Sequence, residues 1–417
     1  MLASLLLPLP LLCPQSTVYV PDHHPTIQDA LYAVTSGDTI IVRAGTYYEA
    51  GIDFLGKDVL LTSEEGAART TIDGMSSNSV VEFHSGESPA AVLDGFTITN
   101  GKKWDGGGVA VLADLNGNAS SPTIQNCVIE YNIGDGGGGG MNIAGGSSSL
   151  VRNCLIQHNT TTHYHGAGVV IFDSTPVFEQ CTIRNNVAAG QGGAIQVWNS
   201  GSYLYLNGCI LQDNTPSNIE RTGMTGATGV LAEYSLCQGD QLKFWFGTGC
   251  IDDDALFAAG PNGDAYLSHL AAGQPADSPC IDAGDPAVAP GGSTRTDGFS
   301  DTGLVDLGYH HPPRDLLLSI SNLVAGALTT IEVTGNDPGD AVLVGYSVFG
   351  GGPINSPFGP VFLTPPYVPL PALTADPQGK AALTAPVPPA GAGRSVWLHA
   401  LNQTLGMLTN PLAEVIQ

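Results

Sequence analysis

The chain has 417 residues, of which 55 are glycine, 29 are proline and only 12% are charged. This composition excludes long helical architectures, because glycine costs about 1 kcal/mol and proline about 3 kcal/mol inside a helix. The formal net charge of −25 argues against nucleic acid or an anionic lipid surface as a partner, since neutralising phosphates requires clustered lysine and arginine. We therefore expect a mostly β protein with an acidic, solvated surface.

The first residues form an apolar run from Leu2 to Leu12 without a charged side chain. This run is shorter than the roughly 20 residues that span a bilayer, but it fits the hydrophobic region of a secretory signal. A basic segment before the run is missing, so either the signal is atypical or the true start lies upstream. Residues 1–16 are predicted to be a signal peptide, and the protein is predicted to be secreted or held at the cell surface, with no transmembrane span.

A repeat of about 27 residues organises the middle of the chain. Successive copies carry a cysteine followed five residues later by an asparagine, and a glycine-rich element such as GGGM (138–141) lies between copies. An earlier copy has Phe96 where the later ones have cysteine. The repeated pairs are Cys127 with Asn132, Cys154 with Asn159, Cys181 with Asn186 and Cys209 with Asn214.

Each repeat is too short for a globular domain and contains short alternating apolar runs, which are typical of half-buried strands. The repeat predicts a solenoid whose coils stack about 4.8 Å apart, so that equivalent residues form columns. We expect buried free thiols in the cysteine column. We expect the asparagines to adopt a left-handed turn conformation and to bond to one another. Cys237 and Cys250 lie outside the column and are either free or paired with each other.

The period, the asparagine column and the element Gly192-Gly193-Ala194-Ile195 resemble right-handed parallel β-helix proteins of the pectate-lyase-like superfamily. The segment Arg184-Asn185-Asn186 before that element is also similar to the repeats of polymorphic outer-membrane adhesins. The segments at 277–286 and 306–313 resemble the tail of secreted bacterial β-helix proteins. The resemblance covers roughly residues 17–310 and implies a right-handed parallel β-helix.

A short helix is predicted near the start of the solenoid, where it would cover the open end of the stacked strands. Thr26 is its expected N-cap, with Asp29 three residues later, and a strand is expected from Thr39 to Val42. One face of the helix carries apolar residues, namely Ile27, Ala30, Leu31 and Val34.

The composition changes at Pro312-Pro313, which we interpret as a domain boundary. Residues 314–417 contain no cysteine and hold five or more short alternating runs, which predict an antiparallel β-sandwich. The expected fold class is therefore all-β. It comprises a right-handed parallel β-helix over residues 17–311, with a helical cap, and a small β-sandwich over residues 314–417.

Three loops, at 101–105, 133–135 and 160–165, are expected to stack on one side of the solenoid. Their aromatic faces and hydrogen-bonding groups suit a sugar chain, and a lysine or histidine there could act as a base toward a uronic acid. The alternative is a set of solvated loop tips without a function. The candidate ligand-binding residues are Lys102, Lys103, Trp104, Asp105, Asp135, His163, Tyr164 and His165.

An acidic group near the end of the solenoid is a candidate calcium site, because Ca²⁺ takes six to eight oxygen ligands. The alternative is that these aspartates cap turns through their own backbone. Calcium is the only cofactor that the sequence indicates. The candidate ligands are Asp282, Asp285, Asp297, Asp301 and Asp306.

The outward strand positions of the repeats show no paired carboxylates of the kind that glycoside hydrolysis needs, so no catalytic residue is predicted. We expect an exported, non-catalytic protein of the cell surface or extracellular matrix that binds an extracellular polysaccharide or a surface protein. The alternative is a Ca²⁺-assisted polysaccharide lyase or another carbohydrate-active enzyme. The outward positions considered are Ala110, Asn142, Val170, Gln196, Glu130, Gln157, Arg184 and Gln212.

Overall fold

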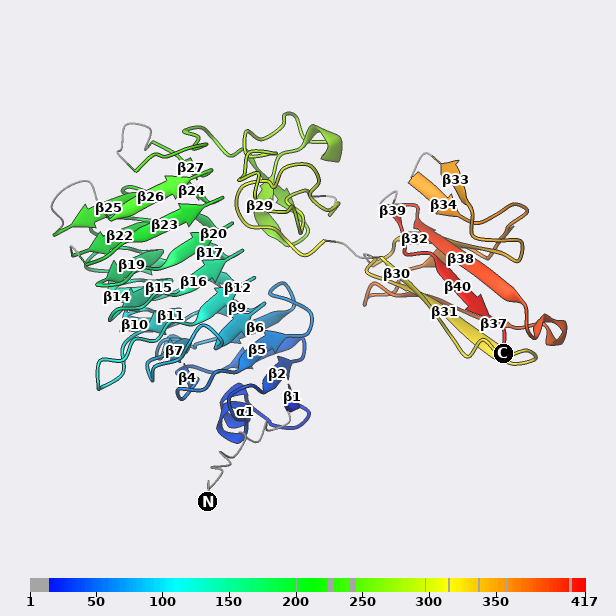
Figure 1. Cartoon of the computed structure of the whole chain (residues 1–417), viewed down its shortest axis with the longest axis horizontal. Coiled ribbons are helices and arrows are strands. Elements are labelled where there is room, and N and C mark those ends of the chain that lie inside the picture. The colour runs from blue at the N-terminus through cyan, green and yellow to red at the C-terminus, as the bar shows by residue number, and fades with distance from the viewer. Residues whose placement is uncertain are drawn as a thin grey trace, which may run out of the picture. The chain divides into compact units, whose positions relative to one another are not determined.

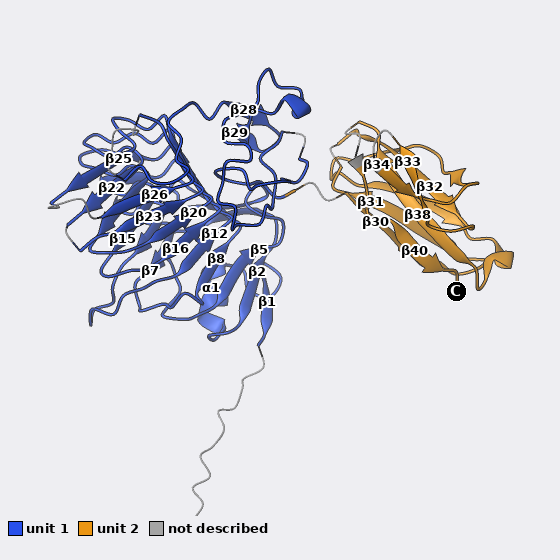
Figure 2. Ribbon diagram, turned by 45° about the horizontal axis from the view of Figure 1, so that its top comes forward, with its two compact units in different colours: residues 1–312 blue, residues 313–417 orange. Residues whose placement is uncertain are grey.

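The computed structural model contains two compact units, Met1–Pro312 and Pro313–Gln417 (Figure 2). Most of the predicted signal peptide lies outside the described residues. Those residues are 15–199, 201–223, 229–239, 245–296, 298–313, 316–336, 338–356, 359–404 and 407–417.

The first unit is a parallel β-helix in which three long sheets run along the coil axis (Figure 1). Every strand pair within these sheets is parallel and in register, as a solenoid requires. The first sheet comprises β1 (Thr17–Val20), β2 (Thr39–Val42), β5 (Leu60–Ser63), β8 (Val92–Asp94), β12 (Thr123–Gln125), β16 (Leu150–Arg152), β20 (Val177–Glu179), β23 (Leu204–Asn207) and β26 (Val230–Glu233).

The second sheet, called here the cysteine sheet, has the repeated cysteines immediately before its strands. It comprises β3 (Gly45–Tyr48), β6 (Thr70–Asp73), β9 (Thr97–Thr99), β13 (Val128–Glu130), β17 (Leu155–Gln157), β21 (Thr182–Arg184), β24 (Ile210–Gln212) and β27 (Leu236–Cys237).

The third sheet, called here the groove sheet, follows the glycine-rich elements. It comprises β4 (Ile52–Asp53), β7 (Val81–Phe83), β11 (Val109–Val111), β15 (Met141–Ala144), β19 (Val169–Phe172), β22 (Ile195–Trp198) and β25 (Ile219–Thr222).

The predicted cap helix is present as α1 (Ile27–Ala33). The Thr26 hydroxyl accepts a hydrogen bond from the backbone N–H of Asp29 at 3.0 Å, which satisfies one of the free donors at the helix start. Ile27 and Leu31 are fully buried and join the core of the β-helix. The apolar face thus anchors the helix to the stacked strands.

The cysteine column is buried as predicted, and Phe96 fills the equivalent place in an earlier coil. The thiols of Cys127, Cys154, Cys181 and Cys209 are free and fully buried, so they act as small apolar core groups.

Neither Cys237 nor Cys250, the two cysteines outside the column, forms a disulfide within the described residues. Cys237 pairs in register with Leu211, two positions further along the chain than the column. Ser235 takes the column position instead, where its hydroxyl accepts from the backbone N–H of Cys209 at 3.0 Å. The Cys250 thiol donates to the carbonyl of Ala232 at 3.2 Å, so the alternative of a disulfide between these cysteines is not realised.

The asparagine column forms a continuous hydrogen-bonded ladder. Each side-chain oxygen accepts from the backbone N–H of the equivalent asparagine one coil earlier, at 3.0 Å for both Asn132 to Asn159 and Asn159 to Asn186. The expectation that the asparagines adopt the left-handed conformation is wrong. That conformation belongs to the preceding residue, such as His158 at φ 54°, which leaves the asparagine side chain free to point inward.

The chain leaves the coil path after Ile251, which still pairs in parallel with Leu236, and this differs from the predicted last coils. The hairpin β28 (Phe257–Gly260) and β29 (Gly263–Leu267) is antiparallel, and it is followed by the 3-10 helix η1 (Leu270–Ala272). The hairpin and η1 belong to residues 251–312, called here the covering segment. This segment lies along the outside of the cysteine sheet. The backbone N–H of His310 donates to the Asn153 side-chain oxygen at 2.7 Å, and that of Tyr309 to the hydroxyl of Thr182 at 2.9 Å.

The second unit is an antiparallel β-sandwich, whose two sheets enclose a separate apolar core. One sheet contains β30 (Leu317–Ser321), β31 (Leu328–Thr334) and β37 (Ala381–Pro386). The other contains β32 (Ala341–Ser347), β35 (Val368–Pro369), β36 (Leu373–Thr374), β38 (Ser395–Asn402), β39 (Met407–Leu408) and β40 (Leu412–Val415). A hairpin of β33 (Pro353–Ser356) and β34 (Gly359–Phe362) and the 3-10 helix η2 (Pro389–Gly391) complete the unit.

Candidate functional site

The candidate site lies on the outward face of the groove sheet. One residue of each strand points outward at the same register, so the strand pairing produces a single row along the molecule. The row consists of Asp53, Glu82, Ala110, Asn142, Val170, Gln196 and Glu220.

A three-stranded parallel sheet forms a wall beside this face. Its strands are β10 (Lys102–Asp105), β14 (Ile133–Gly137) and β18 (Thr160–Thr161), so much of the three segments predicted as loops is in fact strand. The glycines of β14 allow this strand to lie close to β10. A Cβ atom on Gly136 would lie 2.5 Å from the indole Nε1 of Trp104, so a side chain here would force the indole ring to move.

A groove of about 510 Å³ lies between this wall and the outward face. Its wall side carries Trp104 and Tyr164, which are 58% and 52% exposed and whose ring centroids lie 6.2 Å apart. The His165 ring lies 5.7 Å from the ring of Trp198. The lining residues are Trp104, Asp105, Leu112, Gly136, Gly137, Asn142, Ala144, Tyr164, His165, Val170, Phe172 and Trp198.

Asp105 is the only carboxylate among the residues that line the groove. Partial burial against the wall removes water from this group and raises the pKa of its carboxyl above the ordinary value. The backbone amide of Gly137 opposes this shift with a smaller effect. The groove thus presents one acidic group among aromatic rings.

Four of the eight predicted ligand-binding residues line the groove, namely Trp104, Asp105, Tyr164 and His165. The other four lie outside its lining. The Lys103 ammonium is paired with Glu82 at 2.8 Å, and Lys102 is exposed. The Asp135 carboxylate accepts from the hydroxyl of Thr162 at 3.0 Å, and the His163 ring stacks on Trp104 at 6.2 Å.

Two aromatic residues of the groove, Phe172 and Trp198, are absent from the sequence-based candidates. They occupy matching register positions at the ends of β19 and β22, one coil apart. Their shared place after the glycine-rich elements was the signal that could have identified them.

An acid–base cluster at the start of the same outward row was also missed. His84 Nε2 lies 3.5 Å from the Asp53 carboxylate and 3.7 Å from that of Glu82, while Lys103 holds the other oxygen of Glu82. The expectation that this face lacks paired carboxylates is therefore wrong. The first two strands of the groove sheet have no cysteine or triple-glycine element before them, so their register could not be aligned from sequence.

The predicted calcium ligands lie in the covering segment, and the structure gives their oxygens protein partners. The Asp306 carboxylate accepts from the backbone N–H of Asp282 at 2.8 Å, and Asp301 accepts from that of Asp306 at 2.9 Å. Asp285 lies apart, beside Asn207 at 3.3 Å.

Asp297 lies outside the described residues. Within the described ranges, no group of three or more histidine, cysteine, aspartate or glutamate side chains could hold a metal ion. Calcium binding stays a prediction.

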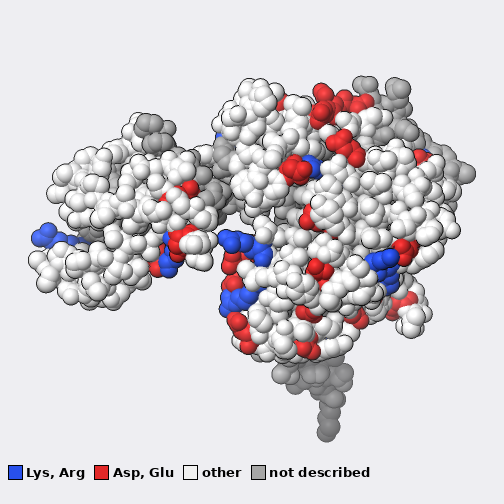
Figure 3. All heavy atoms as spheres, turned by 180° about the vertical axis from the view of Figure 1, so that it is seen from behind, with Lys and Arg blue, Asp and Glu red and all other residues white. Residues whose placement is uncertain are grey.

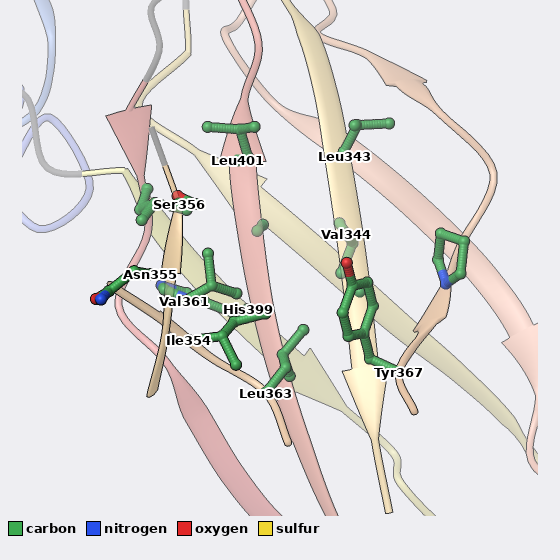
Figure 4. A pocket seen from close by; sticks show the side chains of 14 residues that line it. Leu343, Val344, Ile354, Asn355, Ser356, Val361, Leu363, Tyr367, His399 and Leu401 are labelled. Carbon is green, nitrogen blue, oxygen red and sulfur yellow. The ribbon is translucent and has the colours of Figure 1, made fainter. Parts of the chain in front are cut away.

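The β-sandwich contains a second cavity of about 370 Å³, which is mostly apolar. Figure 4 shows Ile354, Val361 and Leu363 gathered beside His399 of β38. Both imidazole nitrogens of His399 already have backbone partners, at Phe362 and Thr409. This cavity therefore offers few free polar groups for orienting a ligand.

Charged side chains are sparse on the face of the molecule drawn in Figure 3 and stand in small separate groups. The sequence contains 38 acidic residues against 13 lysines and arginines, so the few charges are predominantly negative. No part of this face presents an extended basic surface of the kind that would attract a polyanion.

Comparison with known proteins supports the fold. Residues 59–232 match the family model described as "Right handed beta helix region". No curated protein sequence matches the chain. Within the described residues, no helix is long and apolar enough to cross a membrane.

Among solved structures, the chain is similar to the pectin methylesterase from Aspergillus niger in its deglycosylated form, at 16% identity and a TM-score of 0.34. That likeness covers 57% of this chain and 80% of the other. The same enzyme in a penultimately deglycosylated form gives equal identity and TM-score and 81% coverage of its own chain. The family-model match and the parallel pairing of the three long sheets show a right-handed parallel β-helix region, as the repeats predict.

Proposed function

We propose that the groove binds a glycan chain and that the protein acts outside the cell as a binding protein. The observation that carries this proposal is the pair of exposed rings of Trp104 and Tyr164 beside a long outward row of strand positions. Aromatic faces stack on the apolar faces of sugars, and nearby polar groups such as Asn142 fix orientation. The predicted signal peptide supports a location at the cell surface or in the extracellular matrix.

Replacing Trp104 by alanine should weaken glycan binding at least about tenfold, because about 1.4 kcal/mol of lost stacking corresponds to a factor of ten. Tyr164→Ala should have a similar effect. Affinity electrophoresis in gels that contain different polysaccharides measures the retardation. Tyr32→Ala is the matched control, since Tyr32 is 64% exposed and lies on α1, away from the groove. Retardation that survives in both groove variants would contradict the proposal.

A second candidate function is cleavage of the bound glycan, and the Asp53, Glu82 and His84 cluster favours it. Glu82 and Asp53 sit on adjacent strands of the outward row, with His84 between their carboxylates. Two neighbouring carboxyl groups can divide acid and base roles in glycoside hydrolysis. Release of reducing ends by the purified protein, lost in Glu82→Gln, would establish cleavage. The absence of any release from the polysaccharides that bind would leave binding alone.

A further inference from the structure

The groove contains one charge, and that charge is negative. Among the residues that the structure describes, no lysine or arginine lines the groove, and the nearby Lys103 ammonium is held by Glu82. His165 Nδ1 accepts a hydrogen bond from the backbone N–H of Gln191 at 2.7 Å. This hydrogen bond fixes the orientation of the imidazole ring. Asp105 is therefore the only aspartate, glutamate, lysine or arginine among the described residues that line the groove.

Asp105 also lacks a cationic partner among the residues that the structure describes. Its carboxylate lies against the wall, where a Cβ on Gly136 would come within 2.8 Å of an oxygen. An exposed carboxylate without a cationic partner pairs most strongly with a ligand that brings a positive charge and a hydrogen-bond donor together. Trp104, which is exposed beside it, offers a ring face that attracts cations in the same way.

We propose that the groove selects glycans that carry protonated amines, such as glucosamine polymers, over N-acetylated and uronic-acid polymers. The ammonium group pairs with Asp105 while the sugar faces stack on Trp104 and Tyr164. An N-acetyl group loses the charge and the ionic hydrogen bond. A uronic acid adds a second negative charge beside Asp105 on a protein whose net charge is −25. This selectivity rests on the proposed glycan binding in the same groove.

Titration calorimetry with the full chain tests the selectivity, using glucosamine, N-acetylglucosamine and galacturonic acid oligomers of equal length. The measurements are made at slightly acidic pH and moderate salt, where the amines are protonated. We expect the glucosamine oligomer to bind at least about tenfold more tightly than the other two, the effect of one charge-assisted hydrogen bond. Asp105→Asn should abolish this preference, so that the glucosamine and N-acetylglucosamine oligomers bind with equal affinity.

Asp135→Asn is the matched control, because it removes the same charge from the neighbouring strand β14, outside the groove. It should keep the full preference for the amine. Equal affinity for the amine and acetylated oligomers, or a preference that persists in Asp105→Asn, would overturn the inference while glycan binding stands. Loss of the preference in Asp135→Asn as well would show a general effect of charge and would also overturn it. If none of the three oligomers binds, both proposals fail.

Discussion

Replacing Asn159 by alanine should lower the free energy of unfolding of the β-helix by at least about 2 kcal/mol. Its side-chain oxygen accepts from the backbone N–H of Asn132 at 3.0 Å, and its amide donates to the carbonyl of Ile129 at 2.8 Å. Both partners are buried between coils, so the variant leaves a donor and an acceptor unsatisfied. Each such buried group costs about 1–3 kcal/mol. Urea denaturation followed by circular dichroism measures the change.

The matched control is Asn262→Ala, in the turn between β28 and β29, where the side chain is exposed. A surface change of this kind should shift the free energy of unfolding by less than about 0.5 kcal/mol. Equal stability of the Asn159 and Asn262 variants would show that the ladder does not hold the coils together, and that the buried strand residues do so alone.

The repeat made the asparagine and cysteine columns predictable, because a fixed period converts sequence spacing into spatial neighbours. The local backbone at the turn was not predictable in the same way. Asn159 and His158 are both acceptable residues for a turn, and only the inward ladder decides that His158 adopts the left-handed conformation. Tertiary contacts, and not local preference, assign that conformation.

The groove was predictable in its position but not in its shape. Gly134, Gly136 and Gly137 read as strand breakers in a sequence, yet here they allow β14 to pair closely beside Trp104. The covering segment was not predictable, since it contacts the cysteine sheet through bonds without any repeat, such as that from Arg184 to Asp264 at 2.7 Å. The repeat in the sequence predicts only the contacts between equivalent positions of neighbouring coils.

Replacing His311 by phenylalanine should make the protein markedly more resistant to acid. His311 is 4% exposed and its ring stacks on Tyr266 at 3.8 Å, while Nε2 has no partner among the described residues. Burial, with a smaller contribution from His310, lowers the pKa of His311 from 6.5 to about 3. The unfolded chain therefore binds a proton near pH 6.5, but the folded protein does so only near pH 3. Stability contributed by this neutral imidazole is thus lost as the pH falls between these values.

Between pH 6.5 and pH 4 the native protein loses about 3 kcal/mol of its free energy of unfolding through His311, at about 1.36 kcal/mol per pH unit. His311→Phe keeps a ring against Tyr266 and the backbone pair with Ser293, but it has no proton to bind. Its unfolding free energy should fall about 3 kcal/mol less than that of the native protein from neutral pH to pH 4.

Burial raises the pKa of Asp306, which acts in the opposite direction, but that effect is common to both proteins and cancels in the comparison. His163→Phe, at an exposed position, should retain the native pH dependence. If the free energy of unfolding changes with pH in the same way for the native protein and His311→Phe, the folded protein accommodates the charged imidazole. Burial of His311 would then not be a source of acid sensitivity.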